Sequence, residues 1–504
     1  MVAPDAPPAE LPDAALEDRL ALGGRSLRQH AARGTLVNAG FLIALSGLGL
    51  LKGFVVAAFL TRTEYGLWGA LLVGLGTLVW LKDVGVADRY VQQDEPDQRA
   101  AFELAFTLEL ALNGLLALLL LAALPVLALI YGRFDLIPPG LALILLLPAT
   151  ALQAPLWIYY RRMAFVRQRT LQAVDPLVSF AVTIGLAIAG AGLWSLVLGA
   201  LAGSWCAAAV AVRSSPYPPR LRWDRQALRS YVRFSWPLLV AALGSLVVAQ
   251  GSMIGGARLA GIAGAGAIAL AASISQWTDR VDGILTSTLY PAICAVRHRT
   301  DLLFESFVKS NRLTLMWGLP FGIALTLFGP DLVHFVLGRR WDPAIVLIQV
   351  FGAAAAINHV AFNWTAYFRA VGDTRPMAVA NVATAVVFLG AALPLLALDG
   401  LPGFAIGMAI VTAAGIAVRT YYLERLFRGY RALAHLVRAV APTVPAAGAV
   451  LALRALETGP RSGPQAAWEL AVYLAVTALA TWALERRLLR EAAGYLRRAA
   501  PAQS

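Results

Sequence analysis

The chain has 504 residues, of which 59% are hydrophobic and only 14% are charged, and its formal net charge is +13. Ordinary soluble proteins are about a quarter charged, so this composition excludes a conventional soluble fold. Five scattered histidines and two cysteines in apolar segments predict neither a metal site nor a disulfide framework.

Residues 1–34 are rich in Pro and Ala and carry mixed charge, without the basic start and apolar core of a signal peptide. We expect a disordered cytoplasmic tail there. The apolar runs that follow predict fourteen membrane-spanning helices, since a helix needs about 20 residues to cross a bilayer. The predicted spans are 35–60, 66–88, 102–131, 137–159, 171–190, 192–212, 235–257, 262–293, 311–330, 343–366, 376–397, 401–418, 439–456 and 467–485.

Charge asymmetry orients these spans. With both termini in the cytoplasm, the cytoplasmic stretches carry 32 Lys and Arg and the outer loops carry 7, counting Arg312 and Arg454 with their adjoining loops. Cytoplasmic loops of membrane proteins carry such an excess. The sequence therefore predicts a multi-pass membrane protein with both termini in the cytoplasm. Its basic cytoplasmic face suits anionic lipid headgroups, and no nucleic-acid partner is needed to explain the charge.

Residues 213–234 form the most basic of these loops, with six arginines. The stretch "WDRQALRSYVRF" is typical of a short interfacial helix, which Asp224 can cap. Leu228, Tyr231 and Val232 share one face of this helix. We interpret the segment as an anchor lying on the membrane, with a substrate-binding role as the alternative.

The same loop divides an internal repeat. "IYGRFDLIPPG" and "VLGRRWDPAIV" share Gly-Arg, an aromatic residue, Asp and Pro, and Gly132 and Gly338 lie 206 residues apart. Spans one to six therefore resemble spans seven to twelve, a parallel repeat of a kind found in transporters. The predicted parts are an N-lobe (35–212), a linker (213–234), a C-lobe (235–418), a basic cytoplasmic loop (419–438), two appended spans (439–485) and a cytoplasmic tail (486–504).

Several segments resemble one family of membrane transporters. They are "LTRTEYG", "LKDVGVADRYVQ", "YYRRMAFVRQR", "GAGLWSLVLGALAG", "PRLRWDRQALRSYVRFSWPLL", "LYPAICAVR" and "LGRRWDPAIVLIQVFG". In this order and spacing, over roughly residues 35–430, they resemble the polysaccharide transporters, or Wzx-type oligosaccharide flippases, of the multidrug/oligosaccharidyl-lipid/polysaccharide (MOP) exporter superfamily. The resemblance implies a MATE-like all-α fold of two six-helix bundles and two further helices, and a central cavity.

The resemblance also implies a function. Such a protein lies in the bacterial inner membrane. It moves an undecaprenyl-pyrophosphate-linked oligosaccharide to the outer leaflet without a cofactor, for O-antigen, exopolysaccharide or capsule biosynthesis. A polysaccharide polymerase and chain-length or export machinery would be further partners. Related flippases often carry Tyr-Arg near the start of span eight, where this chain has Ala271 and Ala272. It instead carries Asp279, Arg280 and Asp282 deeper in that span.

These intramembrane charges are the first candidate site residues, because a charge at mid-bilayer needs a cavity or a partner. Arg280 is a candidate ligand for pyrophosphate, whose oxygens a guanidinium fork matches. Its alternative role is internal pairing with Asp279 or Asp282, which are themselves candidates for ion coupling. Lys52 in span one is a second candidate phosphate cation, or a side chain that snorkels outward.

Span three offers Glu109 and Asn113, which share a helix face at i, i+4. Glu109 is a candidate for proton coupling, and a helix–helix hydrogen bond is its alternative role. Asp83 is a further ion-coupling candidate near the cytoplasmic boundary. Gln250, Asn113 and Asn363 are candidates for a sugar-compatible cavity, or for inter-helix contacts.

Three rival functions remain open. A multidrug exporter would share the fold, a lipid II flippase would differ only in its glycan, and an enzyme would need an extramembrane catalytic region. No catalytic motif occurs in this sequence, and its outer loops are short. We therefore expect a transporter, with no catalytic residues.

Overall fold

The computed structural model describes residues 27–60, 64, 67–68, 71, 85–131, 133–360, 363–431, 437–457 and 459–498. No strand occurs in these ranges, so the predicted all-α class is confirmed. The chain divides into two compact units, Met1–Leu239 and Val240–Ser504. Each unit has its own hydrophobic core.

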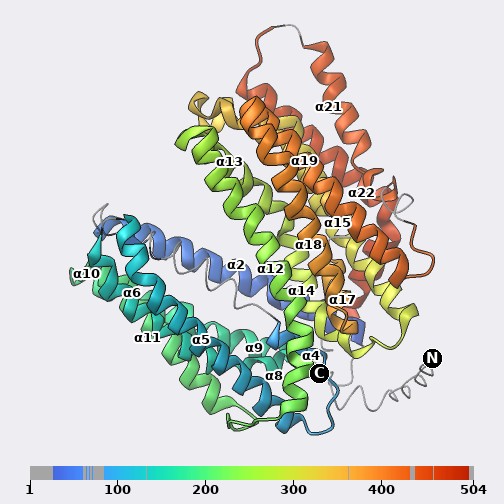
Figure 1. Ribbon diagram of the computed structural model, residues 1–504. Helices are drawn as coiled ribbons and strands as arrows, with labels where there is room; N and C mark the ends of the chain where they lie inside the picture. The colour runs from blue at the N-terminus through green and yellow to red at the C-terminus, as the bar shows by residue number, and fades with distance from the viewer. Residues whose placement is uncertain are drawn as a thin grey trace. The chain divides into compact units, whose positions relative to one another are not determined.

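The first unit is built around α5, whose apolar face packs on the helices that follow it in the chain (Figure 1). Leu116, Leu120 and Leu124 of α5 meet Leu143 and Val197 in one cluster. The helices of this unit are α2 (Leu27–Phe59), α4 (Val86–Gln92), α5 (Gln98–Tyr131), η1 (Phe134–Leu136), α6 (Ile137–Ile144), α7 (Leu146–Ala151), α8 (Leu156–Arg161), α9 (Phe165–Gln172), α10 (Val174–Ile188), α11 (Leu193–Ser214) and the start of α12 (Arg225–Leu259).

In the second unit, small residues allow neighbouring helices to approach closely. A Cβ atom at Gly322 would lie 2.5 Å from the carbonyl oxygen of Gly352, so α15 and α16 approach backbone to backbone. The helices that follow α12 are α13 (Gly261–Ser275), η2 (Gln276–Asp279), α14 (Arg280–Ala295), α15 (Thr300–Leu332), η3 (Val333–Leu337), η4 (Arg339–Ala344), α16 (Ile345–Asn358), α17 (Trp364–Val371), α18 (Arg375–Val387), η5 (Phe388–Ala392), α19 (Leu393–Leu426), α21 (Val444–Leu456) and α22 (Gly463–Arg498).

Ten helical stretches in the described residues are long and apolar enough to cross a membrane. One of them, Arg375–Leu426, contains two predicted spans that meet at Gly400, where φ is 63°. Predicted span eight is divided by η2, and α21 has only 13 residues. Most of predicted span 66–88 lies outside the described residues. These differences explain why the ten stretches are fewer than the fourteen predicted spans.

The predicted interfacial helix is wrong as a separate element. Asp224 does cap its start, since its Oδ1 accepts hydrogen bonds from the backbone N–H groups of Gln226 (2.8 Å) and Ala227 (3.1 Å). However, the helix continues without a break as α12, because no glycine lies between Arg225 and Pro237, and Pro237 itself is accommodated inside the helix. Tyr231 is 6% exposed and packs with Leu228 in a core cluster of the first unit, whereas Val232 is 56% exposed. Part of the predicted membrane-facing side therefore covers protein.

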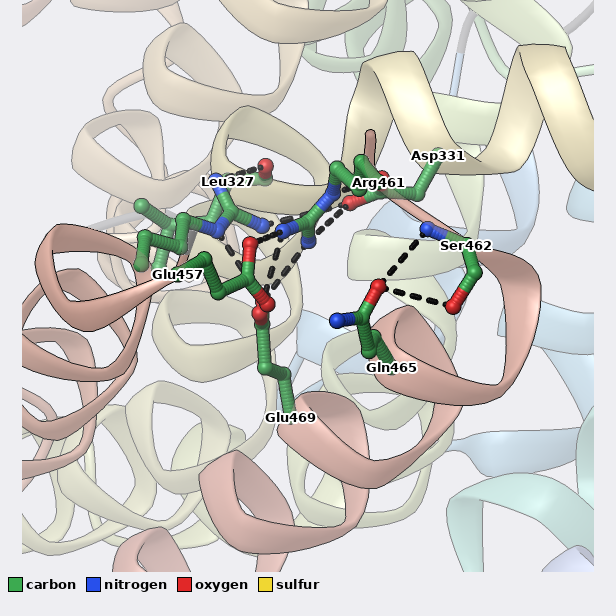
Figure 2. Close-up of polar contacts among 8 residues, drawn as sticks. Leu327, Asp331, Glu457, Arg461, Ser462, Gln465 and Glu469 are labelled. Atoms are coloured by element: carbon green, nitrogen blue, oxygen red, sulfur yellow. Dashed lines mark hydrogen bonds and ion pairs between the residues drawn. The ribbon is translucent and has the colours of Figure 1, made fainter. Parts of the chain in front are cut away.

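Ion pairs join the two C-terminal helices to α15. The sequence predicted these helices as an appendage to the repeat. Figure 2 shows Arg461 between Asp331 at the end of α15 and Glu469 of α22. Arg461 Nε lies 2.5 Å from Asp331 Oδ1, and Arg461 Nη2 lies 2.6 Å from Glu469 Oε2. Arg454 also contacts both carboxylates, at 3.2 Å and 3.0 Å. The hydrogen bond to Asp331 is the foremost cause of a raised pKa of Arg461, which holds its charge.

Candidate functional site

The charged stretch of predicted span eight coincides with a change of helix type. Helix α13 ends at Ser275, a short 3-10 turn covers Gln276–Asp279, and α14 begins at Arg280. A 3-10 turn is tighter than an α-helix, so it changes the direction in which successive side chains point. Asp279, Arg280 and Asp282 therefore point into different surroundings.

Asp279 meets a histidine that lies 80 residues further along the chain. The Oδ1 atom of Asp279 is 3.3 Å from Nε2 of His359. The His359 side chain is fully buried, whereas that of Asp279 is 44% exposed. Nδ1 of His359 lies 2.8 Å from the carbonyl oxygen of Ala355, which can only accept, so Nδ1 carries a hydrogen.

The position of the hydrogen on the His359 ring determines how Nε2 interacts with the Asp279 carboxyl group. With Nδ1 protonated, Nε2 of a neutral His359 has a lone pair, which would repel an ionised Asp279 carboxylate. The contact is attractive only if one further proton resides on Nε2 or on the carboxyl group. The pair could therefore hold one further proton, and the more exposed of its two side chains is Asp279.

Gly318 of α15 makes room for the histidine. A Cβ atom at this position would lie 2.7 Å from two carbon atoms of the His359 ring. Real Cβ contacts are not that short, so any side chain at Gly318 would displace the imidazole. The glycine thus fixes the place where the ring meets Asp279.

A chain of neutral polar groups continues from His359 within the second unit. Asn311 Nδ2 donates to the carbonyl oxygen of His359 (3.0 Å) and to Oδ1 of Asn363 (3.2 Å). Asn363 Nδ2 donates to Oγ of Ser310 (2.7 Å), which lies 3.2 Å from the hydroxyl oxygen of Tyr367. Asn363 is 4% exposed, so it supports this network from within the unit.

Arg280 lies outside this network. Its guanidinium carbon sits 4.9 Å from the centre of the Trp277 ring, and its side chain is exposed on the unit. Within the described part of the chain, no carboxylate lies within ion-pair distance of Arg280. Asp279 instead contacts His359, and Asp282 is 4% exposed and accepts from Thr286 (3.2 Å). The charge of Arg280 still acts on the neighbouring Asp279 carboxylate, so the predicted alternative of internal pairing stays open beside the ligand-binding role.

The candidates of the first unit form hydrogen bonds with other side chains of that unit. Lys52 Nζ of α2 donates to Oγ of Ser179 on α10 at 2.7 Å, and the Asp175 carboxylate is close enough to act on its charge. Asn113 Nδ2 donates to Oε1 of Glu109 at 3.0 Å. The Lys52 contact joins two helices, whereas the Glu109–Asn113 contact lies within α5. Thr150 of α7 donates to Oδ1 of Asn113 at 3.2 Å, which joins α5 to α7.

Two further candidates complete the set. Gln250 is half-buried on α12, and Asp83 lies outside the described residues.

The sequence analysis did not predict two contacts of the site, that of His359 with Asp279 and that of Arg280 with the Trp277 ring. The sequence signal for the His359–Asp279 contact was the position of His359 deep in a predicted span. No group of three or more metal-ligating side chains occurs in the described residues.

A family model described as "Polysaccharide biosynthesis protein" matches residues 55–346, more than half of the chain. The chain belongs to this family. The predicted membership of the Wzx-type polysaccharide transporters is thereby confirmed, and belonging to a transporter family agrees with the expectation of a non-enzyme.

Two curated relatives are similar to this family member. The succinoglycan biosynthesis transport protein ExoT of Rhizobium meliloti is 22% identical over 326 residues, which cover 63% of this chain and 65% of that protein. The lipopolysaccharide biosynthesis protein WzxC of Escherichia coli is 22% identical over 344 residues, covering 66% and 69%. The chain thus spans slightly less than two thirds of the length of ExoT.

Solved structures support the fold. A Vibrio cholerae MATE transporter matches with a TM-score of 0.64 at 13% identity, covering 81% of this chain and 98% of that chain. A MOP superfamily transporter from Pyrococcus furiosus matches with a TM-score of 0.65 at 12% identity, covering 79% and 94%. The predicted MATE-like fold is therefore confirmed.

Proposed function

We propose that this protein moves an undecaprenyl-pyrophosphate-linked oligosaccharide across the bacterial inner membrane, for O-antigen, exopolysaccharide or capsule biosynthesis. Membership of the family and the names of ExoT and WzxC support a polysaccharide-related cargo. Transport would proceed by alternating access of the two lobes, the mechanism common in transporters built from repeats.

The proposal rests mainly on the surroundings of the Arg280 guanidinium group. A guanidinium in the middle of a predicted span is costly unless it meets a partner. Arg280 rests on Trp277 and, among the described residues, has no carboxylate within ion-pair distance. A pyrophosphate that passes this depth would supply the missing anion, in a geometry that the planar fork of arginine matches.

The Asp279–His359 pair suits coupling of this transport to protons. Its one exchangeable proton sits next to Arg280 in sequence, and its accessible end is Asp279. Protonation of the pair would change the local charge beside the proposed pyrophosphate contact by one unit. Asp282 is a less suitable coupling group, because it is buried and bonded to Thr286.

Export in cells tests the proposal. In a strain that lacks its own flippase but makes the matching glycan, this protein should restore surface polysaccharide. Arg280→Ala should abolish that restoration at normal abundance, whereas Arg258→Ala, which removes an exposed arginine of α12, should not. Asp279→Asn should remove the dependence of export on the pH gradient. Export that persists in Arg280→Ala would overturn the role of Arg280.

A multidrug exporter is the second candidate, because solved MATE transporters share the fold. The same cells distinguish the two functions. Raised resistance to cationic drugs without surface glycan would favour the exporter. A lipid II flippase would restore peptidoglycan synthesis in cells depleted of their own lipid II flippase.

A further inference from the structure

A pocket of about 320 Å³ lies in the first unit, where the N-terminal end of α2 meets the turn between α8 and α9. Pockets of about 300–1,000 Å³ commonly hold small ligands or parts of larger ones. The residues that line this pocket are His30, Arg33, Gly34, Val37, Met163, Ala164, Phe165, Val166 and Arg167.

One wall of the pocket is fixed by an unusual backbone turn. Met163 is fully buried and has a φ of 56°, and it is the one non-glycine residue with positive φ in the described chain. This conformation is unfavourable for a residue with a side chain, and such strain tends to occur at functional sites. It aims the Met163 carbonyl oxygen at His30, whose Nε2–H donates to it at 2.9 Å.

The pocket is lined by two arginines, and within the described residues no carboxylate forms an ion pair with either of them. Arg33 and Arg167 are both exposed. No acidic residue lines the pocket. The guanidinium carbon of Arg167 lies 4.8 Å from the centre of the Tyr159 ring, which supports the group without consuming its hydrogen bonds.

The remaining walls are apolar and lie at helix ends. Val37 belongs to α2, while Phe165 and Val166 begin α9, and Val166 is 54% exposed. The distribution of Lys and Arg predicts that both ends face the cytoplasm. A cationic pocket with an apolar wall at this level matches a lipid, because the headgroup carries the phosphate and the glycerol and acyl carbons lie beside it.

We propose that this pocket binds the phosphate of an anionic phospholipid of the cytoplasmic leaflet. Arg33 and Arg167 contact the phosphate oxygens, His30 holds the wall in place, and Val37 and Val166 lie against the apolar part of the lipid. The site belongs to the first unit alone. It does not depend on the transport proposal, which rests on Arg280.

The test uses the purified full chain in a neutral detergent, titrated with phosphatidylglycerol or phosphatidylcholine, with bound lipid counted by native mass spectrometry. The wild-type protein should prefer phosphatidylglycerol. The double variant Arg33→Gln with Arg167→Gln should bind it at least about tenfold more weakly, because charged hydrogen bonds to phosphate are among the stronger polar contacts.

A matched double variant, Arg225→Gln with Arg229→Gln, removes the same charge from exposed arginines of α12. It should keep phosphatidylglycerol affinity within about twofold. Equal losses in the two double variants would overturn the pocket in favour of general attraction to a basic surface. Equal binding of inorganic pyrophosphate and phosphatidylglycerol would overturn the lipid assignment. If the double variant Arg33→Gln with Arg167→Gln does not accumulate, the single variant Arg167→Gln replaces it in the same comparison.

Discussion

Arg461 and Arg280 belong to the same unit and have opposite surroundings. Arg461 touches three carboxylates, those of Asp331, Glu457 and Glu469 (Figure 2). Arg280 touches an aromatic ring, with no carboxylate at ion-pair distance in the described residues. The first arginine has its charge balanced by the fold, so it joins helices. The second has no such ion pair among the described residues, and we propose that a mobile anion balances its charge.

This difference separates structural arginines from candidate ligand-binding arginines throughout the chain. Arg454 belongs with Arg461, since it bridges Asp331 and Glu469. Arg33 and Arg167 belong with Arg280. A change to the first kind should lower stability, and a change to the second kind should lower ligand binding or transport.

The largest effect on stability should come from Glu469→Ala. The Glu469 side chain is 2% exposed and accepts from both Arg454 and Arg461, so its removal leaves two guanidinium groups short of a partner. Breaking a buried ion pair in this way should lower the free energy of unfolding by about 3 kcal/mol. Thermal unfolding of the purified protein in detergent measures it.

Glu305→Ala is the matched control. Glu305 pairs with Lys309, but both side chains are more than a third exposed, and Lys309 also contacts Glu491. The expected loss is about 0–1 kcal/mol, as for other surface pairs. Equal losses in Glu469→Ala and Glu305→Ala would contradict a structural role for the Figure 2 network.

The next effect concerns the proton-holding pair beside Arg280. Gly318→Ala places a methyl group 2.7 Å from the His359 ring, which should separate His359 from Asp279. We expect a loss of about 2 kcal/mol in stability from overpacking, together with loss of pH-gradient dependence in export assays. In Gly283→Ala the new methyl group meets no atom within 4 Å, so this variant should retain both properties. If export by the Gly318→Ala variant depends on the pH gradient as in the wild type, the Asp279–His359 pair does not couple transport to protons.

The smallest effect is expected at Glu109→Gln in the first unit. The glutamine keeps an oxygen that accepts from Asn113 Nδ2, so a structural contact survives the change. Unfolding should shift by less than about 1 kcal/mol, and surface glycan should stay at the wild-type level. Loss of pH-gradient dependence at normal abundance would instead move Glu109 into the coupling machinery.

The fold was largely predictable, because long apolar runs require helices in a membrane. The candidate site was predictable only in part. Depth in an apolar run identified Arg280, but the contact of Asp279 with His359 joins residues 80 positions apart and depends on the packing of α15 at Gly318. The continuity of α12 was missed for a related reason, since Tyr231 has a protein partner that the sequence pattern cannot distinguish from a membrane surface.

Binding of undecaprenyl pyrophosphate to the purified protein compares the two arginines most directly. The measurement uses nanodiscs that contain phosphatidylglycerol, so that the pocket of the first unit is already supplied with an anionic lipid. Arg280→Gln should weaken binding at least about tenfold with an unchanged unfolding temperature, because a charged hydrogen bond contributes about 1.5–3 kcal/mol. Arg461→Gln should bind as the wild-type protein does and unfold at a lower temperature. Wild-type affinity in Arg280→Gln would contradict the assignment of its charge to the substrate.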